Sequence, residues 1–188
     1  TIENAAMFDG SADYLSRTPA VAGNKKTWTM SMWVKEGFNH QSTSPTPTLF
    51  GAGDGSAKRM LARIPSGAGT VDMDLTFGIL ESSTWYENNT QASLADPTAW
   101  YHLVFVYDSY NGTAADRKRI YINGVRHTDF SNSVTNPSLG LETAWNDASY
   151  IQYIGCEAAL RYWDGYMAEV HHVDGAALTA DEFGETDD

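Results

Sequence analysis

Three turn-rich stretches of the chain place large aromatic side chains beside polar ones, and these residues offer the clearest chemistry. The stretches are WYENN at residues 85–89, WND at residues 145–147 and RYWD at residues 161–164. Aromatic faces stack on the apolar C–H patches of sugars, while carboxylates and amides hydrogen-bond the hydroxyl groups. The resulting candidates for contact with a glycan or a partner protein are Trp85, Tyr86, Asn88, Trp145, Asp147 and Tyr162.

The same aromatic side chains have a second interpretation, in which they fill the ends of the fold or form contacts between subunits. We hypothesise that Trp85, Tyr86 and Trp145 form an exposed recognition surface. Each of them lies among polar neighbours and outside any alternating apolar pattern. Exposed aromatic rings reduce solubility unless a partner covers them, so this hypothesis requires a ligand.

Composition narrows the classes of partner. The 188 residues are 42% hydrophobic and 12% aromatic, which suits one large domain with its own core. The single cysteine, Cys156, cannot form an internal disulfide. A net charge of −12 repels phosphate backbones and anionic lipid headgroups, so nucleic acid is not expected as a partner. No apolar run approaches the roughly 20 residues that cross a bilayer, and we expect no membrane segment.

Apolar and polar residues alternate with a period of two along most of the chain, which predicts strands with one buried face. The pattern is clearest at residues 27–35 and 71–79. Residues 100–107 are apolar on both faces, as is typical of a central strand that is covered on each side. Further strands are expected at residues 5–8, 48–51, 59–64, 150–154 and 166–173.

The segments between these strands indicate short connections and almost no helix. The dipeptide NG at residues 123–124 predicts a tight hairpin, and the basic run RKR at residues 117–119 is expected at a solvated hairpin rim. Thr179 and Glu182 form a capping box that starts about one helical turn. Many short strands without helical crossovers or a break in composition predict an all-β fold, an antiparallel two-sheet β-sandwich that spans residues 1–188 as one domain.

Four stretches, taken in order, resemble the concanavalin A-like lectin/glucanase superfamily, in its laminin G-like and pentraxin-like branch. They are AMFDGSADYL at residues 6–15, WTMSMWV at 28–34, WYHLVFVYD at 100–108 with IYING at 120–124, and WDGYMAEVHHVDGAALTADEF at 163–183. The resemblance covers nearly the whole chain and implies a concanavalin A-like jelly roll. The last stretch looks most like modules on virion proteins of tailed bacteriophages, particularly marine ones, which implies a virion or extracellular location.

The resemblance also implies a metal ligand and a buried aromatic residue. Family members often hold Ca²⁺ at the rim of the sandwich with aspartates and backbone carbonyls. The segment LFGAGDG at residues 49–55 resembles the loop that carries one such aspartate, so Asp54 is the implied calcium ligand. Its second acidic ligand is not placed, and Asp9 and Asp13 could equally be turn residues that bond backbone amides. Trp163 is implied to be buried, as its equivalent usually is.

Residues suited to catalysis are not spaced as the family's enzymes require. A retaining glycosidase of this superfamily holds two carboxyl groups roughly 5 Å apart, usually on an E-x-D-x-x-E strand, and the chain has no such segment. Near the C-terminus, Glu169 and His171 share a strand face, whereas His172 points the other way and cannot chelate a metal with His171. His102 is interpreted as bonding backbone at a strand end. We therefore expect no enzyme activity.

Two function classes follow from these observations. The first is a non-catalytic recognition module that binds a polysaccharide or other glycan for a phage virion or surface protein. The second is a structural subunit, decorating a capsid or associated with a tail, which acts through contacts with other virion proteins or as a homo-oligomer. A glycoside hydrolase of the same fold is a third alternative. Solvent-exposed clustered aromatics would favour the first class, and aromatics buried at a symmetric interface would favour the second.

Overall fold

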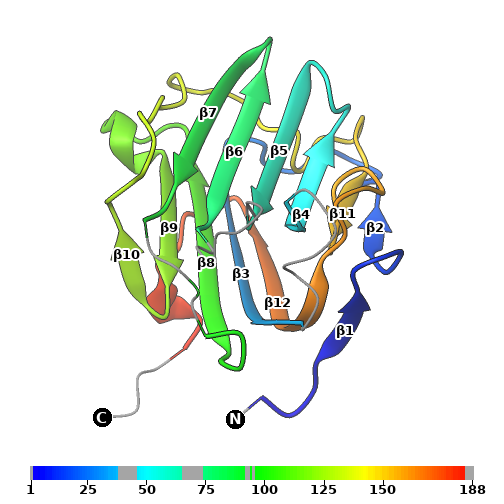
Figure 1. Ribbon diagram of the computed structural model, residues 1–188. Coiled ribbons are helices and arrows are strands. Elements are labelled where there is room, and N and C mark those ends of the chain that lie inside the picture. Colours follow the sequence, from blue (N-terminus) through cyan, green and yellow to red (C-terminus); the bar gives the residue numbers. More distant parts are fainter. Residues whose placement is uncertain (1, 38–45, 65–73, 92–93, 95, 185–188) are drawn as a thin grey trace.

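The computed structural model describes residues 2–37, 46–64, 74–91, 94 and 96–184. Two antiparallel sheets of six strands each lie face to face (Figure 1). The back sheet has the strand order β1 (Ala6–Asp9), β12 (Asp164–Asp174), β3 (Thr27–Glu36), β8 (Tyr101–Asp108), β9 (Lys118–Ile122) and β10 (Val125–His127). The front sheet has the order β2 (Leu15–Arg17), β11 (Gln152–Ile154), β4 (Thr48–Gly53), β5 (Lys58–Arg63), β6 (Thr76–Glu81) and β7 (Thr84–Asn89). The predicted two-sheet β-sandwich is confirmed.

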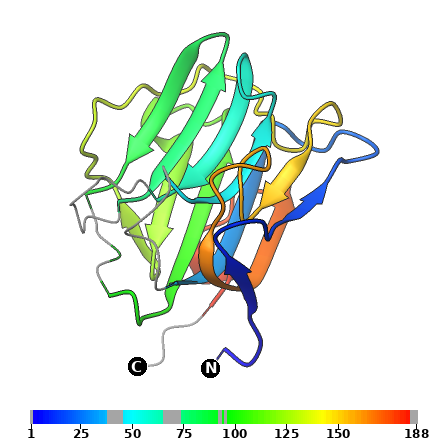
Figure 2. The same cartoon turned by 45° about the vertical axis from the view of Figure 1, so that its right-hand side comes forward.

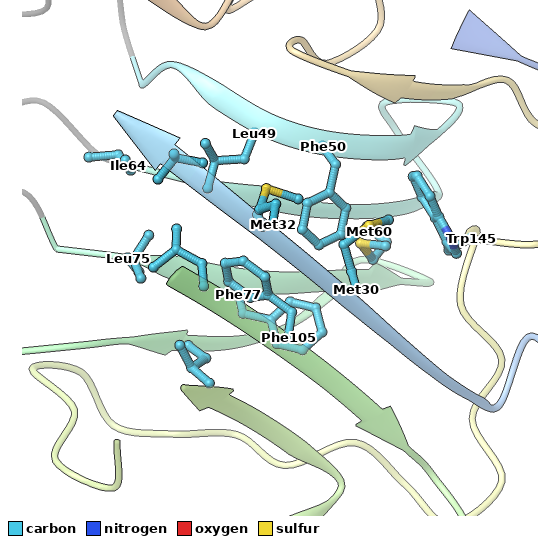
Figure 3. Close-up of a cluster of buried hydrophobic side chains, with 14 of the residues drawn as sticks. Met30, Met32, Leu49, Phe50, Met60, Ile64, Leu75, Phe77, Phe105 and Trp145 are labelled. Carbon is cyan, nitrogen blue, oxygen red and sulfur yellow. The ribbon is translucent and has the colours of Figure 1, made fainter. Parts of the chain in front are cut away.

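The core lies between the sheets and follows from the alternation seen in the sequence. In β3, Trp28 and Met30 point inward and are at most 1% exposed. From the two sheets, Phe50, Phe77 and Phe105 meet edge to face, with ring centroids 5.2 and 5.6 Å apart for the two pairs that include Phe105 (Figure 3). Offset and edge-to-face pairs of this kind add to the stabilisation from burial. The rings fix how closely the sheets approach.

Strand β8 is covered on both faces, as its sequence predicts. Val104 and Val106 face away from the main core, and a second cluster containing Ala177, Ala180 and Phe183 packs over them. This covering segment includes the short 3₁₀ helix η2 (Ala180–Glu182), at the position predicted for one helical turn, although Thr179 makes no side-chain capping bond. The other 3₁₀ helix, η1 (Ala114–Asp116), precedes β9. Within the described ranges, no helix has the length and hydropathy needed to span a membrane.

The expected position of Lys118 at a solvated rim is wrong. Lys118 is 2% exposed and is the first residue of β9, where alternation turns it inward together with Ile120 and Ile122. Its Nζ donates to the carbonyl oxygens of Phe77 at 3.1 Å and Tyr86 at 2.7 Å, so its long stem joins the back sheet to the front sheet. Burial lowers the pKa of Lys118 to about 7.

Two other strand expectations need adjustment. The strand expected at residues 71–79 is found as β6, which starts at Thr76, while residues 71–73 lie outside the described part of the chain. In β12 the register shifts between Ala168 and His171, and Glu169 has a φ of 48°. This bulge interrupts the simple alternation expected along residues 166–173.

Candidate ligand-binding face

The outer surface of the front sheet carries a group of charged and aromatic side chains that could bind a ligand. Met60 and Phe77 point into the core, so their neighbours along each strand face outward. In register across β5, β6 and β7, Arg59 lies opposite Leu80 and Leu80 opposite Trp85, while Leu61, Gly78 and Glu87 form the next row. We call this surface the arginine face, and its charged and aromatic residues are Arg59, Arg63, Trp85, Glu87, Glu157 and Arg161.

Trp85 lies across the sheet rather than standing away from it. A side-chain carbon at Gly78 would come within 3.2 Å of the Trp85 ring and 3.3 Å of Glu87, so glycine at this position lets both side chains pack closely over the strand. The guanidinium carbon of Arg59 lies 4.7 Å from the centroid of the Trp85 ring. This cation–π contact holds the ring and the guanidinium group in a fixed mutual orientation.

Ion pairs fix the rest of the arginine face. Glu157, in the turn after β11, is 3% exposed, and its two oxygens lie 2.8 Å from Arg59 Nε and 2.8 Å from Arg161 Nη1. Arg63 pairs with Glu87 at 3.3 Å. Burial chiefly lowers the pKa of Arg59, while the charge of Glu157 opposes this. Three guanidinium groups against two carboxylates give this face a local excess of positive charge on a chain of net charge −12.

A cluster of tyrosines borders the arginine face at the other end of the front sheet. Tyr153 on β11 faces outward beside Gly51, and the ring of Tyr14 lies 5.8 Å from it. Tyr162, a residue predicted to bind a ligand, lies 6.2 Å from Tyr14 and donates its hydroxyl hydrogen to the carbonyl oxygen of Ala159. Trp85 and these tyrosines therefore stand on opposite sides of the ion-pair network.

The expectation that Trp85 and Tyr86 lie in a loop is wrong, since both belong to strand β7. Ser82 and Ser83 adopt φ values of 49° and 71°, which make a tight turn and return the chain along β6. Of the three β7 residues predicted to bind a ligand, Trp85 alone faces outward. Tyr86 packs against the core, and Asn88, which is 2% exposed, also points inward, so neither joins the arginine face.

The expectation that Trp145 is exposed is also wrong. It is 3% exposed, and its ring lies 5.5 Å from Phe50 at the end of the core, beside Met60 (Figure 3). The residues two positions before and after Trp145 hold its loop in place. Thr143 Oγ1 accepts from Trp28 Nε1 at 3.1 Å, and Asp147 pairs with Lys25 at 3.3 Å. Asp147 therefore serves the loop and lies apart from the arginine face. Trp163, implied to be buried, is 0% exposed.

Asp54 holds a turn in a way that does not suit a calcium site. Its Oδ1 accepts from the backbone N–H groups of Ser56, Ala57 and Lys58 at 2.9 to 3.0 Å. Among the residues that the structure describes, no group of three or more His, Cys, Asp or Glu is placed to hold a metal ion. Since Ca²⁺ takes six to eight oxygen ligands, the described residues around Asp54 do not fit it. Calcium binding at Asp54 stays a prediction from the resemblance.

The two histidines that the sequence singles out for catalysis, His102 and His171, lie away from the arginine face. His102 bonds a side chain rather than backbone through its ring: its Nε2 lies 2.9 Å from Ser31 Oγ, and the ring stacks on Trp33 at 5.0 Å. These residues line a hollow of about 450 Å³ on the outer face of the back sheet, which also includes Glu169 and His171. In the described ranges no carboxylate hydrogen-bonds His102, so the arrangement lacks the third member of a nucleophile–base–acid triad.

The solved structures that resemble this chain include several modules of the same fold. Domain 4 of AbnA, a GH43 extracellular arabinanase from Geobacillus stearothermophilus, was solved with arabinotriose and is 18% identical, covering 94% of this chain and 85% of its own, with a TM-score of 0.56. The CBM40 of the Ruminococcus gnavus IT-sialidase is 12% identical, covering 95% of each chain, with a TM-score of 0.56. Tailspike protein 2 of Escherichia coli O157:H7 bacteriophage CAB120 is 11% identical, covering 94% of this chain and 23% of its own, with a TM-score of 0.58.

At these identities the likeness shows a common fold. No curated protein sequence matches the chain. The family model Laminin G 3, described as concanavalin A-like lectin/glucanases superfamily, matches residues 9–183. This range contains all the strands from β2 to β12 and the whole arginine face. The chain therefore belongs to the concanavalin A-like lectin/glucanases superfamily.

Proposed function

We propose that the chain is a non-catalytic recognition module that binds a glycan on its arginine face. The observation that carries this proposal is the fixed set of groups on one surface: the Trp85 ring, held by Arg59, beside an ion-pair network centred on Glu157. An aromatic ring suits the C–H surface of a sugar, and guanidinium and carboxylate groups suit its hydroxyls. Because the groups are already ordered, a ligand loses less free energy in organising them.

The same network favours binding over hydrolysis. A retaining glycosidase needs one carboxyl group that donates a proton and another that attacks the sugar. Both oxygens of Glu157 are engaged by guanidinium groups, and Glu87 is paired with Arg63. The carboxylates of this face are therefore committed to holding the arginines in place.

The charge of the face favours an acidic glycan. Two arginines meet at Glu157 and a third pairs with Glu87, so positive charge is in excess there, although the whole chain carries −12. Guanidinium groups bind carboxylates in a planar, two-pronged geometry that a neutral sugar does not use. The relatives named as an arabinanase domain and a sialidase CBM40 support a glycan ligand.

For the setting of the module, we propose a virion or another extracellular protein, supported by the likeness to a bacteriophage tailspike. A second candidate function is a capsid-decorating or tail-associated subunit, or a homo-oligomer, that acts through protein contacts. It is favoured by the edge strands β1 and β2, where Met7 is 63% and Leu15 is 62% exposed. Exposed edge strands with apolar side chains can pair with another chain.

The test is retention of the protein on immobilised acidic and neutral polysaccharides, such as alginate and arabinan. We expect Trp85→Ala to weaken retention by about 1–3 kcal/mol, as for loss of an aromatic contact, with the fold intact. Tyr110→Ala is the matched control, because Tyr110 is 59% exposed and lies outside the arginine face. If the two variants weakened retention equally, the arginine face would not be the glycan site. If the protein assembled normally into a particle but was retained on no polysaccharide, the structural function would replace the proposed one.

A further inference from the structure

A cavity of about 330 Å³ opens between the two sheets, away from the arginine face. It lies at the side of the sandwich where β2 and β11 of the front sheet approach β12 of the back sheet (Figures 1 and 2). Leu15 and Val170, which are 62% and 39% exposed, stand where the cavity meets solvent. Its volume is that of a pocket for a small organic molecule.

Two buried donors in this cavity have no hydrogen-bond partner within the described part of the chain. They are the indole Nε1 of Trp145 and the amide Nε2 of Gln152, whose side chains line the cavity. The residues are only 3% and 5% exposed. Buried polar groups in folded proteins are nearly always bonded, so two unpaired donors in one cavity point to a ligand or water that supplies acceptors.

A positive charge stands beside these donors. Arg17 is the cross-strand partner of Gln152 in the β2–β11 pair, and both line the cavity. His172 faces them from the back sheet: burial chiefly lowers its pKa, and the charge of Arg17 lowers it further, against the effect of Asp174. An indole N–H and a guanidinium group only donate, so the complementary ligand group is an anionic acceptor.

The remaining walls of the cavity are apolar and lie next to its polar end. Leu15 pairs with Ile154 across β2 and β11, two residues along from the Arg17–Gln152 pair and so on the same face of the sheet. Met30 on β3 and Val170 on β12 face them from the other sheet. The cavity therefore has a polar end with donors and a positive charge, and an apolar end lined by aliphatic side chains.

We propose that this cavity binds a small monocarboxylate with an apolar body. The carboxylate oxygens accept from Trp145 Nε1, Gln152 Nε2 and the Arg17 guanidinium group, and the apolar body lies against Leu15, Ile154 and Met30. The site is already organised, because the loop of Trp145 is tied down by Asn146, which donates to Asp174 at 3.0 Å. It is independent of the arginine face, since the side chains of Arg17 and Gln152 point to the opposite side of the front sheet.

Calorimetry with sodium octanoate tests the proposal, with 1-octanol as a probe of the same chain length that lacks the carboxylate. We expect saturable octanoate binding at one site. Trp145→Phe keeps an aromatic ring at this position and removes the N–H, and Gln152→Met keeps the length and removes the amide. Each of these, and Arg17→Met, should weaken octanoate binding about tenfold or more, as for a lost charge-assisted hydrogen bond. Octanol binding should change little.

Arg63→Met on the arginine face is the matched control and should leave octanoate binding unchanged. Val170→Trp places a bulky ring at the cavity mouth from an exposed position and should abolish binding without unfolding the protein. Absence of saturable octanoate binding by the wild type would overturn the proposal. Water would then be the partner of the Trp145 and Gln152 donors. Equal binding of octanoate and octanol, unaffected by the three cavity variants, would likewise overturn it by showing unspecific apolar association.

Discussion

The amine of Lys118 donates to the carbonyl oxygen of Tyr86 at 2.7 Å, which places a lysine of one sheet against the backbone of the other. A second bond, to the carbonyl oxygen of Phe77, uses another of its hydrogens. A neutral amine has two hydrogens to donate, so both bonds persist after deprotonation. The free-energy cost of burying Lys118 therefore comes from its charge and not from missing hydrogen-bond partners.

Stability should therefore rise with pH between about 7 and 10. The pKa of Lys118 is about 7 in the folded chain against an ordinary value of 10.5, so in this window the unfolded chain binds more protons. The free energy of unfolding then increases by up to about 1.4 kcal/mol per pH unit from this group alone. Urea unfolding across this window should show the slope in wild type and a smaller slope in Lys118→Met. Parallel pH curves for the two proteins would contradict the assignment.

Truncating Trp145 should destabilise the fold strongly. Its ring is 3% exposed against Phe50, and loss of a buried aromatic side chain costs about 3–5 kcal/mol. Tyr110→Ala, at an exposed position, should change the free energy of unfolding by no more than about 0.5 kcal/mol. Denaturant titration of both variants measures this difference. A Trp145→Ala protein as stable as the control would place the ring outside the core.

Replacing Asp54 distinguishes between two roles for this residue, stabilising a turn and binding calcium. As a turn residue that bonds three backbone N–H groups, it should lower the melting temperature when changed to Ala, equally in chelator and in millimolar Ca²⁺. Asp54→Asn keeps an acceptor oxygen and should lose less. If Ca²⁺ raises the melting temperature of wild type and Asp54→Ala removes that rise, mass action would instead establish the calcium site.

Incubation with glucans, galactans and alginates should release no reducing ends, because the carboxylates of the arginine face are bound by guanidinium groups. Glu157→Gln, at the arginine face, and Glu169→Gln, in β12 of the back sheet, serve as the decisive variants. Sustained turnover that either variant abolishes would show that the chain is an enzyme.

The sequence predicts the fold well because buried strands leave a pattern with a period of two. In β3, Trp28 and Met30 are buried as the alternation requires, and residues 100–107 form the expected central strand. The resemblance to the superfamily, carried by short motifs, agrees with the family match over residues 9–183.

The candidate site was harder to predict, for physical reasons that differ between residues. In the edge strand β7, Trp85 faces outward and Asn88 inward, so the usual link between apolar character and burial is reversed. Lys118 is buried because its amine reaches carbonyl groups of the other sheet, which sequence spacing does not reveal. Trp145 enters the core from a loop, where no period exists to mark it. The partners of Arg59, namely Trp85 and Glu157, lie far along the chain.

The position of β12 between β1 and β3 governs when this chain can acquire its fold. Ala6 of the first strand pairs with Met167 of the last one, so β1 has no neighbour in its sheet until β12 emerges from the ribosome. Until then the inner strand β3 also keeps one edge unpaired. Pairings between such distant segments make folding slow, and unpaired edges invite association with other chains. A nascent chain that ends before β12 is therefore the species in most need of a chaperone.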